Sequence, residues 1–278
     1  MTRKTTTQID ETDLAARIRE ALATLRLPHT SQRFEELLGE PKPDQSRLEW
    51  LWALLEPQVR NRVESRFERA VKSARLPERK TLEAFQFDFQ PTLDKDLVLE
   101  LGTLAFVKAK KNVLLAGMSG TGKSHIALAL ALNACVANLR VRYTTSAAML
   151  RTLNASLADD TLEEALKPYT TPELLVLDEV GLEQVERTIA CRAGLMQKVL
   201  LPRYEKRPTI ITSNIPWESW GDYLADHLGA GALVDRLLHH SHVIVVNGPS
   251  WRDHQHRLQV KEEAARKPKA ASKKKPDR

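Results

Sequence analysis

The sequence predicts an α/β fold, a parallel sheet flanked by helices, with a small all-helical domain in front of it. Short apolar runs alternate with helical segments through residues 112–248, which is typical of parallel strands joined by right-handed crossovers. A glycine-rich loop stands between the first of these strands and the helix that follows it. With 278 residues, the chain can form one substantial core and a small accessory domain.

Residues 1–80 are interpreted as the helical N-terminal domain. Its first helix carries four apolar residues at helical spacing: Leu14, Ile18, Leu22 and Leu25. Pro28 is expected to end that helix. Two further helices are expected, one from about residue 47 to 55 and one from about 58 to 74.

The last of these helices carries a row of arginines, Arg62, Arg66 and Arg69, spaced four and three residues apart. Such a row can neutralise the phosphates of DNA, so these three residues are the candidate DNA contacts. A salt-bridged surface is the alternative, because Glu68 and Lys72 form a favourable pair four residues apart.

Residues 81–111 are interpreted as a junction. Phe85, Phe87 and Phe89 alternate along it, which predicts a locally extended chain. We expect their rings to pack against the core, and an adenine pocket walled by them is the alternative.

The core is expected to span residues 112–256. Its five predicted strands cover residues 112–116, 141–144, 174–177, 209–212 and 242–246. The third is a continuous apolar run, as in strands that are buried on both faces. Residues 257–278 are rich in Lys, Ala and Pro and are predicted to form a basic, disordered tail.

Positive charge is concentrated in two segments of a chain whose net charge is +6. Residues 60–80 and residues 261–278 each hold eight Lys or Arg and three acids, so each contributes +5 and the remainder about −4. These clusters favour an anionic partner at those two places. Each is also compatible with a solvated surface.

The composition argues against a membrane protein. The first dozen residues contain no apolar signal-peptide core. The most apolar stretch, residues 126–139, contains two asparagines and is shorter than the ~20 residues of a membrane span.

Cys135 and Cys191 lack partners at metal-ligand spacing and are interpreted as buried, reduced thiols. We therefore expect a cytoplasmic protein.

Residues 117–124 read Gly-Met-Ser-Gly-Thr-Gly-Lys-Ser, which is the Walker A pattern of a P-loop. Its glycines let successive main-chain N–H groups point at phosphate oxygens, and the helix behind the loop adds its own N-terminal N–H groups. Lys123 should reach the β- and γ-phosphates, and Ser124 should bind Mg²⁺. The predicted ATP-binding residues are Gly117, Ser119, Gly120, Thr121, Gly122, Lys123 and Ser124.

An acidic pair follows the third strand. Parallel strands place their carboxyl ends on the ligand-binding edge of the sheet, so Asp178 should hold the Mg²⁺ shell and Glu179 should activate the attacking water. Asn214, at the end of the fourth strand, is the candidate sensor of the γ-phosphate. Arg236 is the candidate arginine finger, a group often supplied by a neighbouring molecule, and an ion pair on the helix surface is the alternative.

With these residues placed, the chain resembles the AAA+ subgroup that contains IstB-like transposition helper ATPases and DnaC-like helicase loaders. The segments that carry the resemblance are residues 25–28, 34–37, 112–124, 141–145, 175–181, 209–214, 233–239 and 247–252. The resemblance implies an AAA+ P-loop NTPase core without a full helical lid. It also implies Mg²⁺-dependent ATP hydrolysis, assembly into a homo-oligomer in the ATP state, binding of double-stranded DNA, and capture of a transposase.

The favoured function is an ATPase that assists transposition on target duplex DNA. A DnaC-like helicase loader is the alternative, and the N-terminal helical domain favours the first. A scaffold that binds ATP without hydrolysing it is a third possibility, against which the intact Glu179 argues. A small-molecule kinase is the fourth, and the sequence contains no recognisable acceptor pocket for it.

Overall fold

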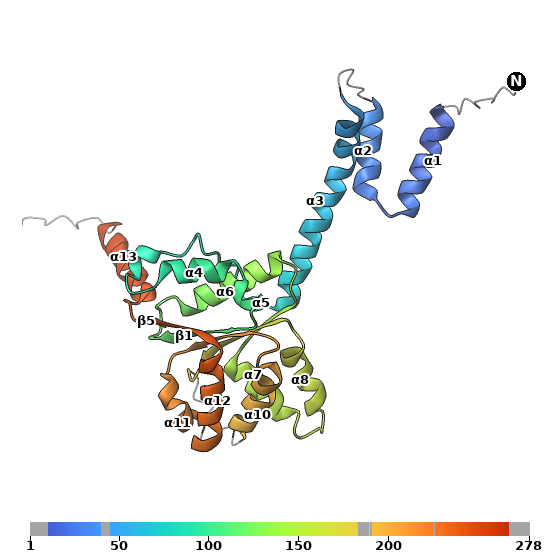
Figure 1. The fold of residues 1–278 in the computed structure, drawn as a ribbon. Coiled ribbons are helices and arrows are strands. Elements are labelled where there is room, and N and C mark those ends of the chain that lie inside the picture. Colours follow the sequence, from blue (N-terminus) through green and yellow to red (C-terminus); the bar gives the residue numbers. More distant parts are fainter. Residues whose placement is uncertain (1–10, 40–44, 183–188, 190, 225, 267–278) are drawn as a thin grey trace, which may run out of the picture. The chain divides into compact units, whose positions relative to one another are not determined.

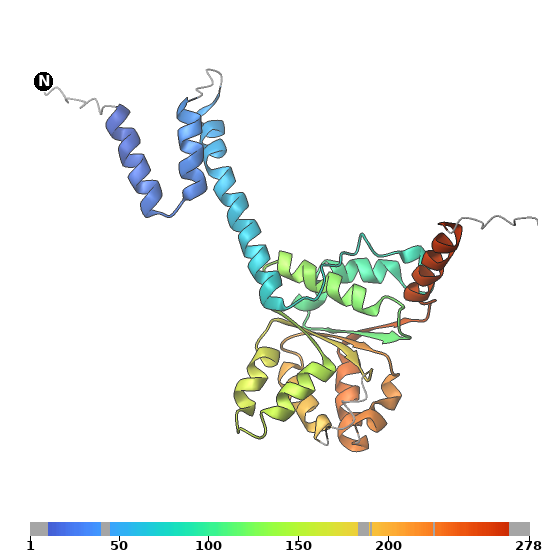
Figure 2. The same cartoon turned by 180° about the vertical axis from the view of Figure 1, so that it is seen from behind.

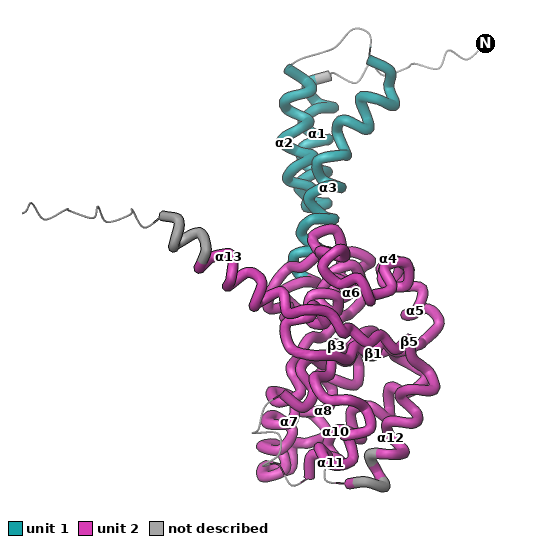
Figure 3. Tube along the Cα trace, turned by 90° about the vertical axis from the view of Figure 1, so that its left-hand side faces the viewer, with its two compact units in different colours: residues 1–69 teal, residues 70–278 magenta. Residues whose placement is uncertain are grey.

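The computed structural model describes residues 11–39, 45–182, 189, 191–224 and 226–266 (Figure 1). The chain divides into two compact units, residues 1–69 and residues 70–278, which are coloured separately in Figure 3. Among the described residues, none of the helices combines the length and the apolar character that crossing a lipid bilayer requires.

The first unit is helical, as the sequence predicts. It contains α1 (Glu11–Thr24), α2 (Pro28–Gly39) and most of α3 (Arg47–Ala74). Its core consists of four buried apolar side chains, Leu22, Phe34, Leu37 and Leu54. Pro28 follows α1, as expected, and it is also the first residue of α2. At that position the N–H that proline lacks would have no partner within the helix, so no hydrogen bond is lost.

The expectation of two separate helices around Pro57 is wrong, because α3 is continuous through that residue. Contacts on both sides of the proline explain why. Leu54 is buried in the core of the unit, and the side chain of Gln58 accepts a hydrogen bond of 3.2 Å from the main chain of His29. Packing therefore compensates for the hydrogen bond that proline removes.

The junction is wound rather than extended. Phe87–Phe89 form a 3₁₀ turn, η1, followed by α4 (Lys95–Gly102) and α5 (Ala105–Lys108). Of the alternating phenylalanines, Phe85 is buried, as expected, whereas Phe87 and Phe89 are half-buried. The Phe85 ring lies 5.3 Å from that of His125, and the Phe89 ring lies 4.8 Å from that of Trp251.

Five parallel strands form the sheet, which confirms the predicted α/β class. They are β1 (Asn112–Gly117), β2 (Val141–Thr145), β3 (Leu174–Val180), β4 (Thr209–Ser213) and β5 (Ser241–Val246), in the order β2-β3-β4-β1-β5. Because all strands run the same way, their carboxyl ends share one edge, where the P-loop begins.

Helices cover both faces of the sheet (Figures 1 and 2). One face carries α4, α5 and α6 (Lys123–Val136). The other carries α7 (Ser146–Ala155), α8 (Leu162–Thr170), α10 (Arg192–Leu200), α11 (Trp220–Leu224) and α12 (His227–His239). Cys135 is buried in α6, as expected, whereas Cys191 is exposed just before α10.

After β5 the chain continues as α13 (Trp251–Arg266). The disorder predicted from residue 257 is therefore wrong for residues 257–266, and the rest of that tail lies outside the described residues. The local cause is visible in the sequence, because residues 251–266 contain no proline or glycine and the prolines begin at residue 268.

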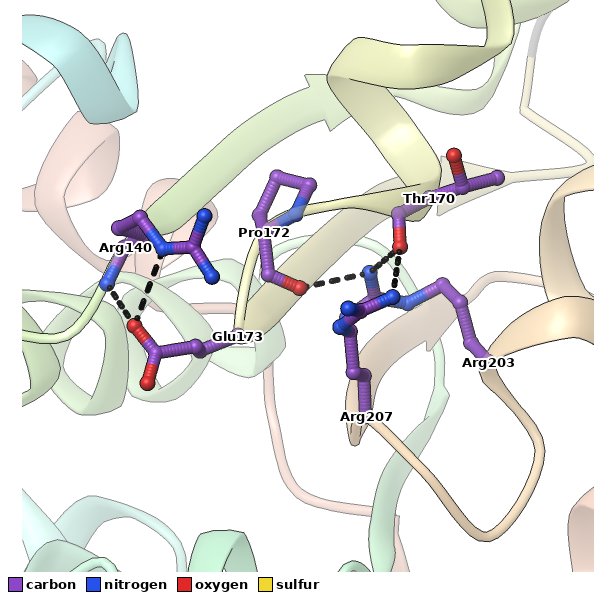
Figure 4. A network of polar contacts seen from close by, with 6 residues as sticks. All are labelled: Arg140, Thr170, Pro172, Glu173, Arg203 and Arg207. Atoms are coloured by element: carbon purple, nitrogen blue, oxygen red, sulfur yellow. Dashed lines mark hydrogen bonds and ion pairs between the residues drawn. The ribbon is translucent and has the colours of Figure 1, made fainter.

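A buried arginine fixes the amino-terminal ends of β3 and β4 (Figure 4). Arg203, in the 3₁₀ turn Leu201–Arg203, is 1% exposed. Its guanidinium donates to the carbonyl oxygens of Tyr169 and Pro172, both at 2.9 Å, and of Pro208 at 2.7 Å. These bonds tie the turn to the segments that enter the two strands, which carry the acidic pair and Asn214 to the opposite edge.

Candidate nucleotide site

The loop after β1 has the tight curvature that phosphate binding requires. Gly117 and Gly122 adopt positive φ angles of 147° and 101°, which side chains disfavour. A Cβ atom on Gly117 would lie 2.2 Å from the carbonyl oxygen of Val246, and one on Gly122 would lie 2.6 Å from the Phe85 ring. A side chain at either position would collide with the protein itself, so this curvature of the loop requires glycine at both.

Segments far away in the sequence brace this loop. The N–H of Trp251 donates to the carbonyl oxygen of Gly120 at 2.9 Å. The hydroxyl of Thr121, 1% exposed, donates to the carbonyl oxygen of Met118 at 2.9 Å. Phe85 packs on the loop at Gly122, so this phenylalanine supports the cradle. Whether they also wall an adenine pocket stays a prediction.

Lys123 lies at the base of the cradle with 5% of its surface exposed. Its ammonium donates to the carbonyl oxygens of Gly117 at 2.9 Å and Met118 at 2.8 Å. Burial lowers the pKa of Lys123 to about 8, against the opposing effect of the Asp178 carboxylate. The charge is thus held inside the loop, where a phosphate would meet it.

This pKa predicts how ATP binding depends on pH. Phosphate is attracted by the protonated form, and the free protein loses that proton near pH 8. ATP affinity should therefore fall by up to about tenfold per pH unit above that point. Titration with a fluorescent ATP analogue on both sides of pH 8 measures this slope. Lys123→Arg, which keeps its charge, should show no such slope. A pH-independent wild-type affinity would contradict the prediction.

Asp178 lies beside Ser124, as the Walker motifs predict. The Ser124 hydroxyl donates to Asp178 Oδ1 at 2.9 Å, and the hydroxyl of Thr212 donates to the same oxygen. The phenol of Tyr143 donates to Asp178 Oδ2 at 2.7 Å. Asp178 is 2% exposed, so three hydroxyl groups from α6, β4 and β2 take the place of water around it.

These oxygen donors suit Mg²⁺, which takes one or two protein oxygens together with phosphates and water. Within the described residues, no group of three or more His, Cys, Asp or Glu side chains could hold a metal ion. A metal held by Ser124 and Asp178 would therefore depend on the nucleotide for its remaining ligands.

Glu179 occupies a β-bulge. Leu177 pairs with Ile211 and Val180 pairs with Ser213, so β3 has one residue more than β4 in this interval. Glu179 has a positive φ of 62°, and its N–H donates to the Thr212 hydroxyl at 2.9 Å. A non-glycine residue in this conformation costs roughly 1 kcal/mol or more and persists where its surroundings impose it. The bulge gives two consecutive acids different directions at the edge of the sheet.

This geometry agrees with comparisons to known proteins. The model of the IstB-like ATP binding protein family matches residues 20–259. The chain belongs to the IstB-like ATP-binding proteins. The resemblance proposed from the sequence is thereby confirmed, and the bound nucleotide of the family is ATP.

Relatives of this IstB-like protein come from bacterial insertion sequences. One from insertion sequence IS21 of Pseudomonas aeruginosa, named as ATP-binding, is 38% identical over 83% of this chain and 86% of its own length. One from IS5376 of Geobacillus stearothermophilus is 32% identical over 87% of this chain and 96% of its own. Among solved structures, DnaI matches with a TM-score of 0.50 at 22% identity over 62% of this chain and 90% of its own, which supports the AAA+ fold alone.

In this IstB-like protein, Asn214 lies where β4 ends, whereas Arg236 lies shortly before the point where β5 begins. Asn214 follows β4, and its N–H donates to the carbonyl oxygen of Val180 at 3.3 Å, next to the acidic pair. Arg236 is exposed in the last turn of α12, just before β5 starts. The roles of both residues stay predictions.

The arginine row of the first unit is exposed. Arg62, Arg66 and Arg69 all lie open to solvent on α3. Within the described residues, none of the three forms an ion pair with an acidic side chain, although Arg69 donates to the carbonyl oxygen of Ser65 at 3.0 Å. Their cationic groups are thus available for an anion.

Sequence reasoning missed Thr212 and Tyr143. Both reach Asp178 from neighbouring strands, and the Thr212 hydroxyl contacts Asp178 and Glu179 together. A signal was present, because each is a hydroxyl-bearing residue on a strand adjacent to β3. This signal can be interpreted only when the strand order and register are known, and a single sequence does not provide them.

Proposed function

We propose that this IstB-like protein is a Mg²⁺-dependent ATPase that assembles on target double-stranded DNA and assists transposition. It would form a homo-oligomer in the ATP state, act in the cytoplasm, and recruit or stimulate a transposase. The observation that carries this proposal is the contact between Ser124 and Asp178 beneath the P-loop, because it joins the phosphate cradle to the acidic pair. The insertion-sequence relatives supply the biological setting.

Each residue of the nucleotide site has its own role in ATP binding and hydrolysis. The P-loop amides and Lys123 hold the phosphates, while Ser124 and Asp178 hold the metal. When bound, Mg²⁺ neutralises charge on the phosphate oxygens. Glu179 orients the attacking water and accepts its proton, and Asn214 contacts the γ-phosphate from the neighbouring strand. The bulge supports this division because it separates the directions of Asp178 and Glu179.

Duplex DNA is expected to contact the arginine row of α3. Counterion release makes such binding fall steeply with salt, with a slope of about 0.9 in log K per log salt for each phosphate contact. Replacing Arg62, Arg66 and Arg69 together by Gln should therefore weaken duplex binding in the presence of ATP and reduce the slope by up to about 3. Fluorescence anisotropy with labelled duplex at several salt concentrations measures both.

Arg60 provides the matched control. It lies on the same helix and is exposed, but its guanidinium pairs with Glu56. Arg60→Gln should leave the salt slope unchanged. An unchanged slope in the triple variant would place the DNA contact elsewhere. Co-purification with a replicative helicase, without ATP-stimulated duplex binding, would favour the helicase-loader alternative.

A further inference from the structure

We propose that Tyr143 is a positioning residue for Mg²⁺ binding, which acts by fixing the orientation of the Asp178 carboxylate. The inference rests on the proposed function, in which Asp178 belongs to the metal shell. Tyr143 does not belong to the Walker motifs. Its phenol contacts Asp178 from β2, which is an outermost strand of the sheet.

Strand register brings the phenol to Asp178. Thr145 pairs with Asp178, and Tyr143 pairs with Val176. Tyr143 therefore lies two residues before the partner of Asp178 and on the same face of the sheet. Side chains at this diagonal spacing are within reach of a long aromatic residue. The hydrogen bond of 2.7 Å from the phenol to Asp178 Oδ2 spans that diagonal. A phenylalanine would fill the same space without the donor.

The two oxygens of Asp178 have different partners. Oδ1 accepts from Ser124 and Thr212, and Oδ2 accepts from Tyr143. Within the described residues, no second donor to Oδ2 is found. The torsion that turns a carboxylate is broad and weakly restrained by itself, so hydrogen bonds must set its plane. The Tyr143 bond holds Oδ2 to one side and keeps Oδ1 directed at Ser124.

The expected consequence is a weaker metal site with an intact nucleotide cradle. Removing a residue that orients a metal ligand typically costs about 10–100-fold in metal affinity or activity. Within the described residues, the hydrogen bond of the Tyr143 phenol goes to Asp178, so the P-loop amides and Lys123 should hold nucleotide as before. The effect should therefore appear in the Mg²⁺ requirement and disappear when Mg²⁺ is saturating.

The test compares wild type, Tyr143→Phe and Tyr204→Phe. Tyr204 packs on His240 and lies before β4, away from the acidic pair. ATP affinity is measured by fluorescence titration in EDTA and across a Mg²⁺ series, and thermal unfolding in EDTA reports folding. For Tyr143→Phe we expect wild-type affinity in EDTA and a Mg²⁺ half-saturation raised about 10–100-fold. ATP hydrolysis should recover at high Mg²⁺. Tyr204→Phe should match wild type.

Two results would overturn the assignment. One is a Mg²⁺ half-saturation in Tyr143→Phe equal to that of wild type. The other is a loss of affinity that is the same in EDTA and in Mg²⁺, which would indicate a role in packing. If wild type itself bound no ATP in the presence of Mg²⁺, the proposed function would be wrong. If wild type binds and Tyr143→Phe behaves identically, only the role of Tyr143 fails.

Discussion

Replacing Glu179 by Gln is expected to slow ATP hydrolysis by about 10²–10⁴-fold, the usual contribution of a positioned general base. ATP binding should persist, because the cradle and Lys123 are untouched. Glutamine has nearly the same shape and keeps the main-chain bond from residue 179 to Thr212. The loss should therefore be chemical rather than structural. Single-turnover hydrolysis and equilibrium ATP binding, measured on the same preparation, separate the two.

Glu173→Gln is the matched control for this variant. Glu173 precedes β3 at the opposite end of the same strand and pairs with Arg140 at 3.3 Å on the surface (Figure 4). Exposed pairs of this kind contribute about 0–1 kcal/mol, so hydrolysis should be unchanged.

The Glu179 variant also tests the scaffold alternative. If hydrolysis drives release from DNA, Glu179→Gln should hold ATP and remain on duplex DNA much longer than wild type. Release at the wild-type rate, despite lost hydrolysis, would support a protein that uses ATP as a structural ligand. Hydrolysis at the wild-type rate would instead remove Glu179 from the mechanism.

The parts of this site that a sequence reveals are those built from consecutive residues. The P-loop is one strand, one loop and one helix, and its eight residues carry their own geometric requirements. The acidic pair is also visible, because it ends an apolar run. The five strands could be predicted for the same reason, since each is a short apolar segment between helices.

The parts that could not be predicted depend on contacts between distant segments. The bulge at Glu179 exists because β3 has one residue more than β4 between two paired positions, which is a property of both strands. Continuity of α3 through Pro57 depends on Gln58 and Leu54 meeting other helices. Within the part of the chain that the structure describes, Arg203 donates to carbonyl and hydroxyl oxygens alone, and the local sequence does not predict these partners.

Replacing Arg236 by Ala is expected to reduce ATP hydrolysis by about 10³–10⁵-fold in the assembled protein, the range typical of arginine fingers. The position of Arg236 decides how it could act. The carbonyl oxygen of His240, just after α12, accepts a hydrogen bond from the N–H of Asn112 at the start of β1. The P-loop follows Gly117 at the other end of that strand, roughly 17 Å away for six residues. The last turn of α12 therefore lies near the end of β1 that is remote from the P-loop, and we propose that Arg236 serves the nucleotide of a second copy.

Mixing two inactive variants tests this directly. Glu179→Gln lacks the base but keeps Arg236, and Arg236→Ala lacks the finger but keeps the base. If the arginine acts between copies, co-assembly creates sites with both groups, and hydrolysis returns above the level of either variant alone. Lys206→Ala, which removes an exposed cation before β4, should retain activity by itself. Mixtures that stay inactive, or an active Arg236→Ala protein, would show that Arg236 does not complete a neighbour's site.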